Sequence, residues 1–231
     1  MEFLFDSFRS AIVLLWSRDP ELYFIIYVSL KVSFGSTLLA SLLGVPAGFL
    51  IAFKDFSGKR FVLTVLNSLL AMPTVVVGLL VYAFISRRGI LGILDLLYTQ
   101  PAIVLGQIIL VFPIVTTLTI TAVSQIDTRY RKTAMTLGAT PFQVALVVFR
   151  EARFGVIAAI IISFGRVIAE VGISMMLGGN AKGYTRTMTT AMALEYDKGE
   201  FILAVALGVA LLLIAFTINI FFNYVQGRAR T

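Results

Sequence analysis

The chain contains 231 residues, of which 59% are apolar and only 13% are charged, and its mean hydropathy is +0.97. Because so few polar groups cannot cover a water-soluble surface, this composition excludes a soluble globular protein and predicts an integral membrane protein. The net charge of +7 does not indicate nucleic acid as a partner, since no basic and aromatic binding module accompanies it.

Five segments are each long enough to cross a hydrocarbon core, which takes about 20 apolar residues. They predict an all-α integral membrane protein with a single transmembrane domain over residues 1–231. Residues 1–20 are too polar to span, and their mixture of aromatic and charged side chains predicts an interfacial amphipathic helix. The five expected spans are residues 24–53, 61–85, 102–123, 154–176 and 201–225.

Glycines and prolines punctuate the first three spans. Gly44 and Gly48 are four residues apart and predict a helix face that a second helix can approach closely. Pro46, Pro73 and Pro113 each remove a backbone donor and favour a kink. A kink can shape a cavity, but proline is also tolerated in membrane helices when neighbours satisfy the freed backbone groups.

A polar, basic stretch that follows the third span contains two successive helix signals. Asp127 or Thr128 can cap a short helix, and Gly138 stands where a left-handed C-terminal cap is favoured. Thr140 and Pro141 then begin a second helix with a capping box. These caps suit a docking segment, and they also suit a plain connection between two spans.

This stretch resembles the EAA loop of ABC importer permeases, in which Glu-Ala-Ala is followed after three residues by Gly. Ala134 and Gly138 keep that spacing, whereas Lys132 and Thr133 replace the first two letters. In that family the loop docks on a separate cytoplasmic ATPase, so the resemblance implies a cytoplasmic coupling loop over residues 126–150. The residues expected to carry the coupling are Arg131, Lys132, Ala134, Met135, Leu137, Gly138, Ala139 and Pro141.

Basic residues are distributed unevenly between the two ends of the spans. One side comprises residues 54–60, residues 127–153 and the tail after residue 225, and it holds ten basic and three acidic residues. The other side holds seven basic and eight acidic residues. By the positive-inside rule the first side is cytoplasmic, which predicts an outer N-terminus and an inner C-terminus. A cytoplasmic ATPase would find the basic stretch on its own side.

Three ionisable residues, Lys31, Arg166 and Glu170, fall within the expected spans. A charge at membrane depth costs about 2.5 to 3.5 kcal/mol on insertion scales, so these groups should face protein or a polar path. Ser163, Arg166, Glu170 and Ser174 recur at three- and four-residue spacing and would share one face of a continuous helix. We interpret this stripe as a substrate path that Lys31 approaches in the outer half. A structural pair between Arg166 and Glu170 is the alternative.

The connection between the fourth and fifth spans is rich in glycine, hydroxyl groups and cations. Backbone amides exposed by glycine, together with Thr, Asn and Arg donors, can form a concave site for an oxyanion. The same loop can instead dock a second protein or simply return the chain to the membrane. The residues singled out are Gly178, Gly179, Asn180, Tyr184, Thr185, Arg186 and Thr187.

The run at residues 164–172 and the loop at residues 178–187 resemble the permease subunits of tungstate ABC importers, with molybdate and sulfate permeases as related groups. The resemblance extends from about Ser29 through the last span. It implies a type I ABC importer permease fold, a homodimer, two ABC ATPase subunits and an extracytoplasmic oxyanion-binding protein. It also implies residence in the lipid bilayer of a prokaryotic cytoplasmic membrane.

The residues absent from the chain bear on its chemistry. It has no His and no Cys, which excludes thiol chemistry and imidazole catalysis, and it has no phosphate-binding loop. We therefore expect no catalytic residue, metal or cofactor in this chain, with ATP and Mg bound by the partner ATPase. An ATP-independent anion channel or carrier and a membrane scaffold without transport remain alternatives. Tungstate, molybdate and other oxyanions are not distinguished by the sequence.

Overall fold

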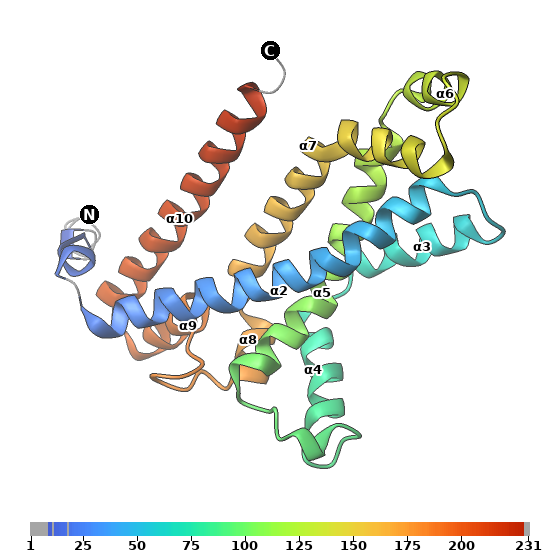
Figure 1. Ribbon diagram of the computed structural model, residues 1–231. Coiled ribbons are helices and arrows are strands. Elements are labelled where there is room, and N and C mark those ends of the chain that lie inside the picture. The colour runs from blue at the N-terminus through green and yellow to red at the C-terminus, as the bar shows by residue number, and fades with distance from the viewer. Residues whose placement is uncertain (1–8, 11, 18, 229–231) are drawn as a thin grey trace.

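The computed structural model describes the backbone of residues 9–228 except residues 11 and 18, and side chains up to residue 220. The described part is helical, without a strand, and its long helices run beside one another (Figure 1). This confirms the predicted all-α class. The elements are α2 (Pro20–Phe53), α3 (Lys59–Leu70), α4 (Thr74–Ile85), η1 (Gly92–Leu94), α5 (Gln100–Ser124), α6 (Thr128–Thr136), α7 (Pro141–Ile168), α8 (Gly172–Gly178), α9 (Met188–Lys198) and α10 (Phe201–Arg228).

The predicted interfacial helix is described only in part, because residues 1–8 lie outside the described residues. Residues 9–10 and 12–16 are helical. Trp16 is 86% exposed, whereas Leu14 and Leu15 pack against a buried cluster. Leu14 and Leu15 therefore contact the bundle, whereas Trp16 faces outward. The place of this segment at a membrane interface stays a prediction.

Three helices, α2, α5 and α10, are each long and apolar enough to cross a membrane. The second expected span is instead two helices, α3 and α4, bent by 100° at residues 71–73. Pro73 is the residue just before α4. It has no backbone N–H to continue the hydrogen-bonding of α3. The predicted kink is therefore a full break between two helices. The fourth expected span is likewise divided into α7 and α8, bent by 60°. Counting each bent pair as one span gives five.

The long helix α2 lies along α5, and glycine permits their close approach. A Cβ atom added at Gly48 would lie 2.6 Å from the backbone oxygen of Thr116 on α5. One added at Gly44 would lie 3.0 Å from a methyl group of Val115. The predicted small-residue face is therefore confirmed as a helix contact.

Gly48→Leu should separate α2 from α5, because the new side chain has no room against backbone atoms. Overpacking of this kind costs about 1–3 kcal/mol. We expect a lower midpoint for thermal aggregation of the detergent-solubilised protein. Gly35→Ala on the same helix is the matched control, since nothing lies within 4 Å of its added Cβ. Equal midpoints for both variants would show that the glycine contact is not needed.

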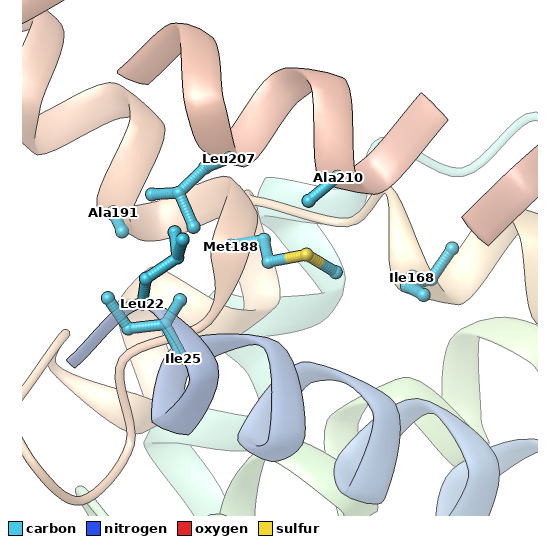
Figure 2. Packing of buried hydrophobic residues seen from close by; sticks show 7 residues of the cluster. All are labelled: Leu22, Ile25, Ile168, Met188, Ala191, Leu207 and Ala210. Atoms are coloured by element: carbon cyan, nitrogen blue, oxygen red, sulfur yellow. The ribbon is translucent and has the colours of Figure 1, made fainter. Parts of the chain in front are cut away.

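A buried apolar cluster joins the first and last helices to α9 (Figure 2). Leu22 and Ile25 of α2 point toward Ala191 of α9 and Leu207 of α10. All four side chains are at most 1% exposed. The cluster fixes α9, and with it one end of the connection from α8.

Candidate functional site

The break between α7 and α8 is organised by Glu170, whose side chain is only 3% exposed. One carboxylate oxygen accepts a hydrogen bond from Arg166 Nη1 at 2.8 Å. The other accepts from the backbone N–H groups of Gly172 at 3.0 Å and Ile173 at 3.4 Å, which caps the N-terminus of α8. Thr189 of α9 donates to the Glu170 carbonyl oxygen at 2.8 Å. Hydrogen bonds of Glu170 thus join α7, α8 and α9.

The expectation that Ser163, Arg166, Glu170 and Ser174 form one continuous stripe is wrong. Helix α7 ends at Ile168, and Ser174 belongs to α8, which turns away by 60°. A spacing rule for one helix does not hold across that break. Arg166 and Glu170 do form the ion pair that the sequence offered as the alternative. The Arg166 side chain remains 42% exposed, so its other N–H groups stay accessible.

Lys31 belongs to a different group of contacts from Arg166. Its ammonium lies 2.8 Å from the Gln100 side-chain oxygen at the start of α5. The Gln100 amide nitrogen donates in turn to the Tyr184 carbonyl oxygen at 2.7 Å. Lys31 is therefore linked through Gln100 to the loop after α8.

A buried polar connection in the centre of the bundle was not anticipated. Gln107 of α5 is 1% exposed, and its side-chain oxygen accepts from Ser36 of α2 at 2.8 Å. Its amide nitrogen lies 3.5 Å from the hydroxyl oxygen of Ser174 on α8. Nearby on α7, Ser163 is fully buried. The uncharged amide of Gln107 within a membrane-spanning segment is the signal in the sequence that indicates this connection.

The loop between α8 and α9 uses most of its polar groups to hold itself together. Thr185 donates to the Gly178 carbonyl oxygen at 2.5 Å and accepts from the Ala181 N–H at 3.0 Å. Thr187 caps α9 through a capping box with Thr190. Satisfied, buried groups of this kind have little capacity left for a ligand. Their positions favour a structural role.

Arg186 connects this loop to α2 and to α9. Its side chain is 10% exposed and lies 3.5 Å from Glu21 of α2 and 3.9 Å from Glu195 of α9. Lys182 adds a 2.6 Å contact to Glu21. Because the guanidinium is enclosed by two carboxylates, it is not an open anion site in the single chain.

The exposed part of the same loop is small. Gly179, Asn180 and Gly183 adopt left-handed backbone conformations that hold the turn, with φ angles of 68°, 51° and 71°. Tyr184 is 48% exposed. Of the predicted contact residues, Gly179 and Tyr184 are therefore exposed and within reach of a docking protein, Asn180 is half-buried, and Gly178, Thr185, Arg186 and Thr187 are buried.

The local structure of the predicted coupling stretch is confirmed. Asp127 caps α6 by accepting from the Arg129 N–H at 2.8 Å. Gly138 has a φ of 79°, and Thr140 forms the expected capping box with Gln143. Both helices of the stretch are thus fixed by local hydrogen bonds.

This helix pair projects at one end of the bundle, far from the loop that joins α4 to α5 (Figure 1). Arg131 lies over the Phe53 ring at 4.7 Å, which attaches α6 to the end of α2. Three large apolar side chains remain uncovered on it, with Met135 53%, Leu137 82% and Phe142 78% exposed. An apolar cluster with a basic surround is typical of a docking surface.

Broken apolar helices with buried polar side chains between them, and a capped helix pair at one end, are typical of a membrane-embedded transport subunit. Residues 44–231 match the family described as binding-protein-dependent transport system inner membrane component. The match covers most of the chain, which therefore belongs to this family of permeases.

Curated relatives extend over nearly the whole chain. It is 40% identical over 219 residues to the tungstate uptake system permease protein TupB of Peptoclostridium acidaminophilum, covering 95% of this chain and 96% of the relative. TupB of Campylobacter jejuni is also 40% identical, over 95% of this chain and 92% of its own. The molybdenum transport permease ModB of Haemophilus influenzae is 29% identical over 72% of this chain and 76% of its own.

Solved structures establish the fold. An inward-facing form of the MetNI methionine ABC transporter matches with a TM-score of 0.75 at 19% identity, covering 94% of this chain and 98% of the solved one. A bacterial alginate ABC transporter in complex with its pentasaccharide-bound periplasmic protein matches with a TM-score of 0.72 at 20% identity, covering 94% and 82%. The predicted type I ABC importer permease fold is confirmed.

Proposed function

We propose that this chain is the membrane-spanning subunit of an ATP-driven importer of a tetrahedral oxyanion, with tungstate as its principal substrate. The observation that carries the proposal is 40% identity to two tungstate uptake permeases over 95% of the chain. Relatives that transport molybdenum are more distant in sequence, at 29% identity. The chain itself has no phosphate-binding loop, so ATP is hydrolysed by a separate ATPase.

The ATPase subunits dock on α6 and the start of α7. The uncovered side chains of Met135, Leu137 and Phe142 supply apolar contact area. Arg131 and Lys132 are exposed beside them and favour an acidic rim on the partner. This end of the bundle also carries the excess of basic residues, which supports a cytoplasmic position, an inner C-terminus and an outer N-terminus.

A second copy of the chain completes the substrate path. Five spans are few for enclosing a polar passage, and large apolar side chains on α4 and α10 are uncovered in the single chain. We assign the exposed guanidinium of Arg166, together with Lys31, to the shared passage. Both present donors that hold a dianion weakly enough to release it. Glu170 orients Arg166 and is a positioning residue.

Transport then follows alternating access. A loaded extracytoplasmic binding protein docks at the end opposite α6, where Gly179 and Tyr184 are exposed. ATP-driven closure of the ATPase pair draws the two coupling stretches together and opens the passage outward. The anion enters, and it leaves to the cytoplasm after hydrolysis.

The assembly is tested by native mass spectrometry of the tagged permease purified from a host that also expresses the adjacent genes. We expect a particle of two permease and two ATPase chains. A monomeric permease without an ATPase would contradict the proposal and favour a channel, a carrier or a scaffold.

A further inference from the structure

The loop that joins α4 to α5 lies at the end of the bundle opposite α6 (Figure 1). The loop between α4 and α5 borders a cavity of about 680 Å³ whose lining includes Tyr82, Ser86, Arg87, Arg88, Asp95 and Tyr98. An adjoining cavity of about 660 Å³ shares the two tyrosines and continues to α8 and Gly179. The two hollows connect this loop with the helix that Glu170 caps.

The loop that carries the two arginines is tightly wound. A Cβ atom added at Gly89 would lie 2.3 Å from the Ala83 carbonyl oxygen, and one added at Gly92 would lie 2.6 Å from that of Ser86. The Leu91 N–H donates to the Phe84 carbonyl oxygen at 2.9 Å. Such close backbone packing requires glycine and presents the neighbouring side chains from a fixed position.

Tyr98 occupies the wall between the two hollows. Its φ of 62° is left-handed, a conformation that costs a bulky residue energy and persists only where the surroundings impose it. Its N–H donates to the Leu177 carbonyl oxygen at 2.8 Å, and its ring leaves no room for a side chain at Gly179. The strained backbone therefore holds the phenol in the cavity wall.

The phenol of Tyr98 is a proton donor at neutral pH. Electrostatic interaction with Tyr82 raises its pKa above the usual range, and partial burial and a hydrogen bond with Tyr82 act in the same direction. Tyr98 consequently stays protonated well into the alkaline range. A neutral phenol can donate to an anion, whereas a phenolate would repel it.

The charges around the cavity are predominantly positive. Arg87 contacts Asp95 at 3.6 Å, with both side chains more than three-quarters exposed. No ion pair joins Arg88 to a carboxylate in the part of the chain that the structure describes. Guanidinium groups bind planar pairs of oxyanion oxygens in bidentate fashion. The cavity thus combines two cations, of which Arg87 is paired with the Asp95 carboxylate, with neutral hydroxyl donors.

We propose that this cavity is a transient binding site for a tetrahedral oxyanion, contacted by Arg88, Arg87 and the hydroxyls of Tyr82 and Tyr98. The inference rests on the proposed function and adds a station between the docked binding protein and Arg166. Tungstate, molybdate and sulfate share the chemistry that the site recognises. Its openness to solvent weakens each contact, which suits an anion that must move on.

The test uses the complete complex in proteoliposomes with ATP inside and saturating loaded binding protein outside. For Arg88→Gln we expect about a three- to fivefold lower rate of tungstate uptake, the size of one solvent-exposed charge contact, and for Tyr98→Phe about a twofold loss. The dissociation constant of the binding protein for the complex should not change. More ATP should be hydrolysed for each anion delivered.

Lys198→Gln is the control, because it removes one positive charge from α9 but lies outside the cavity and outside the loop between α8 and α9. Its uptake should stay near that of the wild type. Normal uptake by the double variant Arg87→Gln/Arg88→Gln would overturn the site. Weaker docking that accounts for the whole loss would also overturn it and assign the arginines to the binding protein. Wild-type complex that takes up no oxyanion would instead defeat the proposed function itself.

Discussion

Glu170→Leu is expected to prevent the accumulation of correctly assembled permease. The change leaves the N-terminus of α8 without its cap and Arg166 without its partner, at a position only 3% exposed. Removing one member of a fully buried, hydrogen-bonded ion pair costs about 3–5 kcal/mol, and because Arg166 is half-exposed we expect a loss at or below the lower end of that range. The measurement is fluorescence-detected size-exclusion chromatography of membranes solubilised in detergent, in which the peak for the assembled protein should be lost.

Glu170→Gln is the matched control. Its amide oxygen can still accept from the Gly172 N–H, so α8 keeps its cap while the negative charge is removed. We expect a smaller loss of assembly than for Glu170→Leu. If both variants assemble equally poorly, assembly depends on the negative charge of Glu170 and not on its capping of α8.

Arg166→Gln distinguishes two roles of Arg166, its structural pairing with Glu170 and its proposed contact with the anion. The Gln side chain can still donate to Glu170, so assembly should be retained. If Arg166 contacts the anion, uptake should fall at least tenfold, because a charge-assisted hydrogen bond is lost. Full uptake by this variant would remove Arg166 from the path.

Gly138→Val should uncouple the permease from its ATPase. The backbone at Gly138 has a φ of 79°, which a β-branched residue adopts at a cost of at least about 1–2 kcal/mol. No atom lies within 4 Å of an added Cβ, so the effect comes from backbone strain and not from a clash. The turn between α6 and α7 would change its angle, and the exposed Leu137 and Phe142 would no longer meet the ATPase together.

The measurement is the ratio of ATPase to permease after purification, together with ATP-driven uptake. We expect both to fall severalfold while the amount of inserted permease stays constant. Gly138→Asn is the control, because Asn tolerates the left-handed conformation. Coupled uptake at the wild-type rate in Gly138→Val would show that the turn is not needed for docking.

Features set by neighbouring residues could be predicted from the sequence. The caps at Asp127 and Thr140 and the left-handed turn at Gly138 depend on groups two to three residues away. A missing backbone donor at Pro73 favours the break there, although Pro46 and Pro113 lie inside continuous helices, so the sequence predicted a kink at Pro73 and not the size of the bend. In these places local chemistry decides the conformation before any tertiary contact forms.

Features set by distant residues could not be predicted in this way. No proline marks the break after Ile168, which is held by the Glu170 side chain and by Thr189 from the following helix. Arg186 is enclosed because Glu21, 165 residues away in the chain, packs against it. Charge and spacing suggested an open anion site in that loop, and the fold instead uses these groups internally.

Tungstate uptake into proteoliposomes containing the permease and its ATPase tests the central claim most directly. With loaded binding protein outside, we predict uptake only when hydrolysable ATP is enclosed, and none with a non-hydrolysable analogue or without the binding protein. Replacing the binding protein by a molybdate-selective one that docks equally well should redirect uptake to molybdate. Tungstate entry that continues at the same rate without ATP or binding protein would contradict the account and identify a channel or carrier.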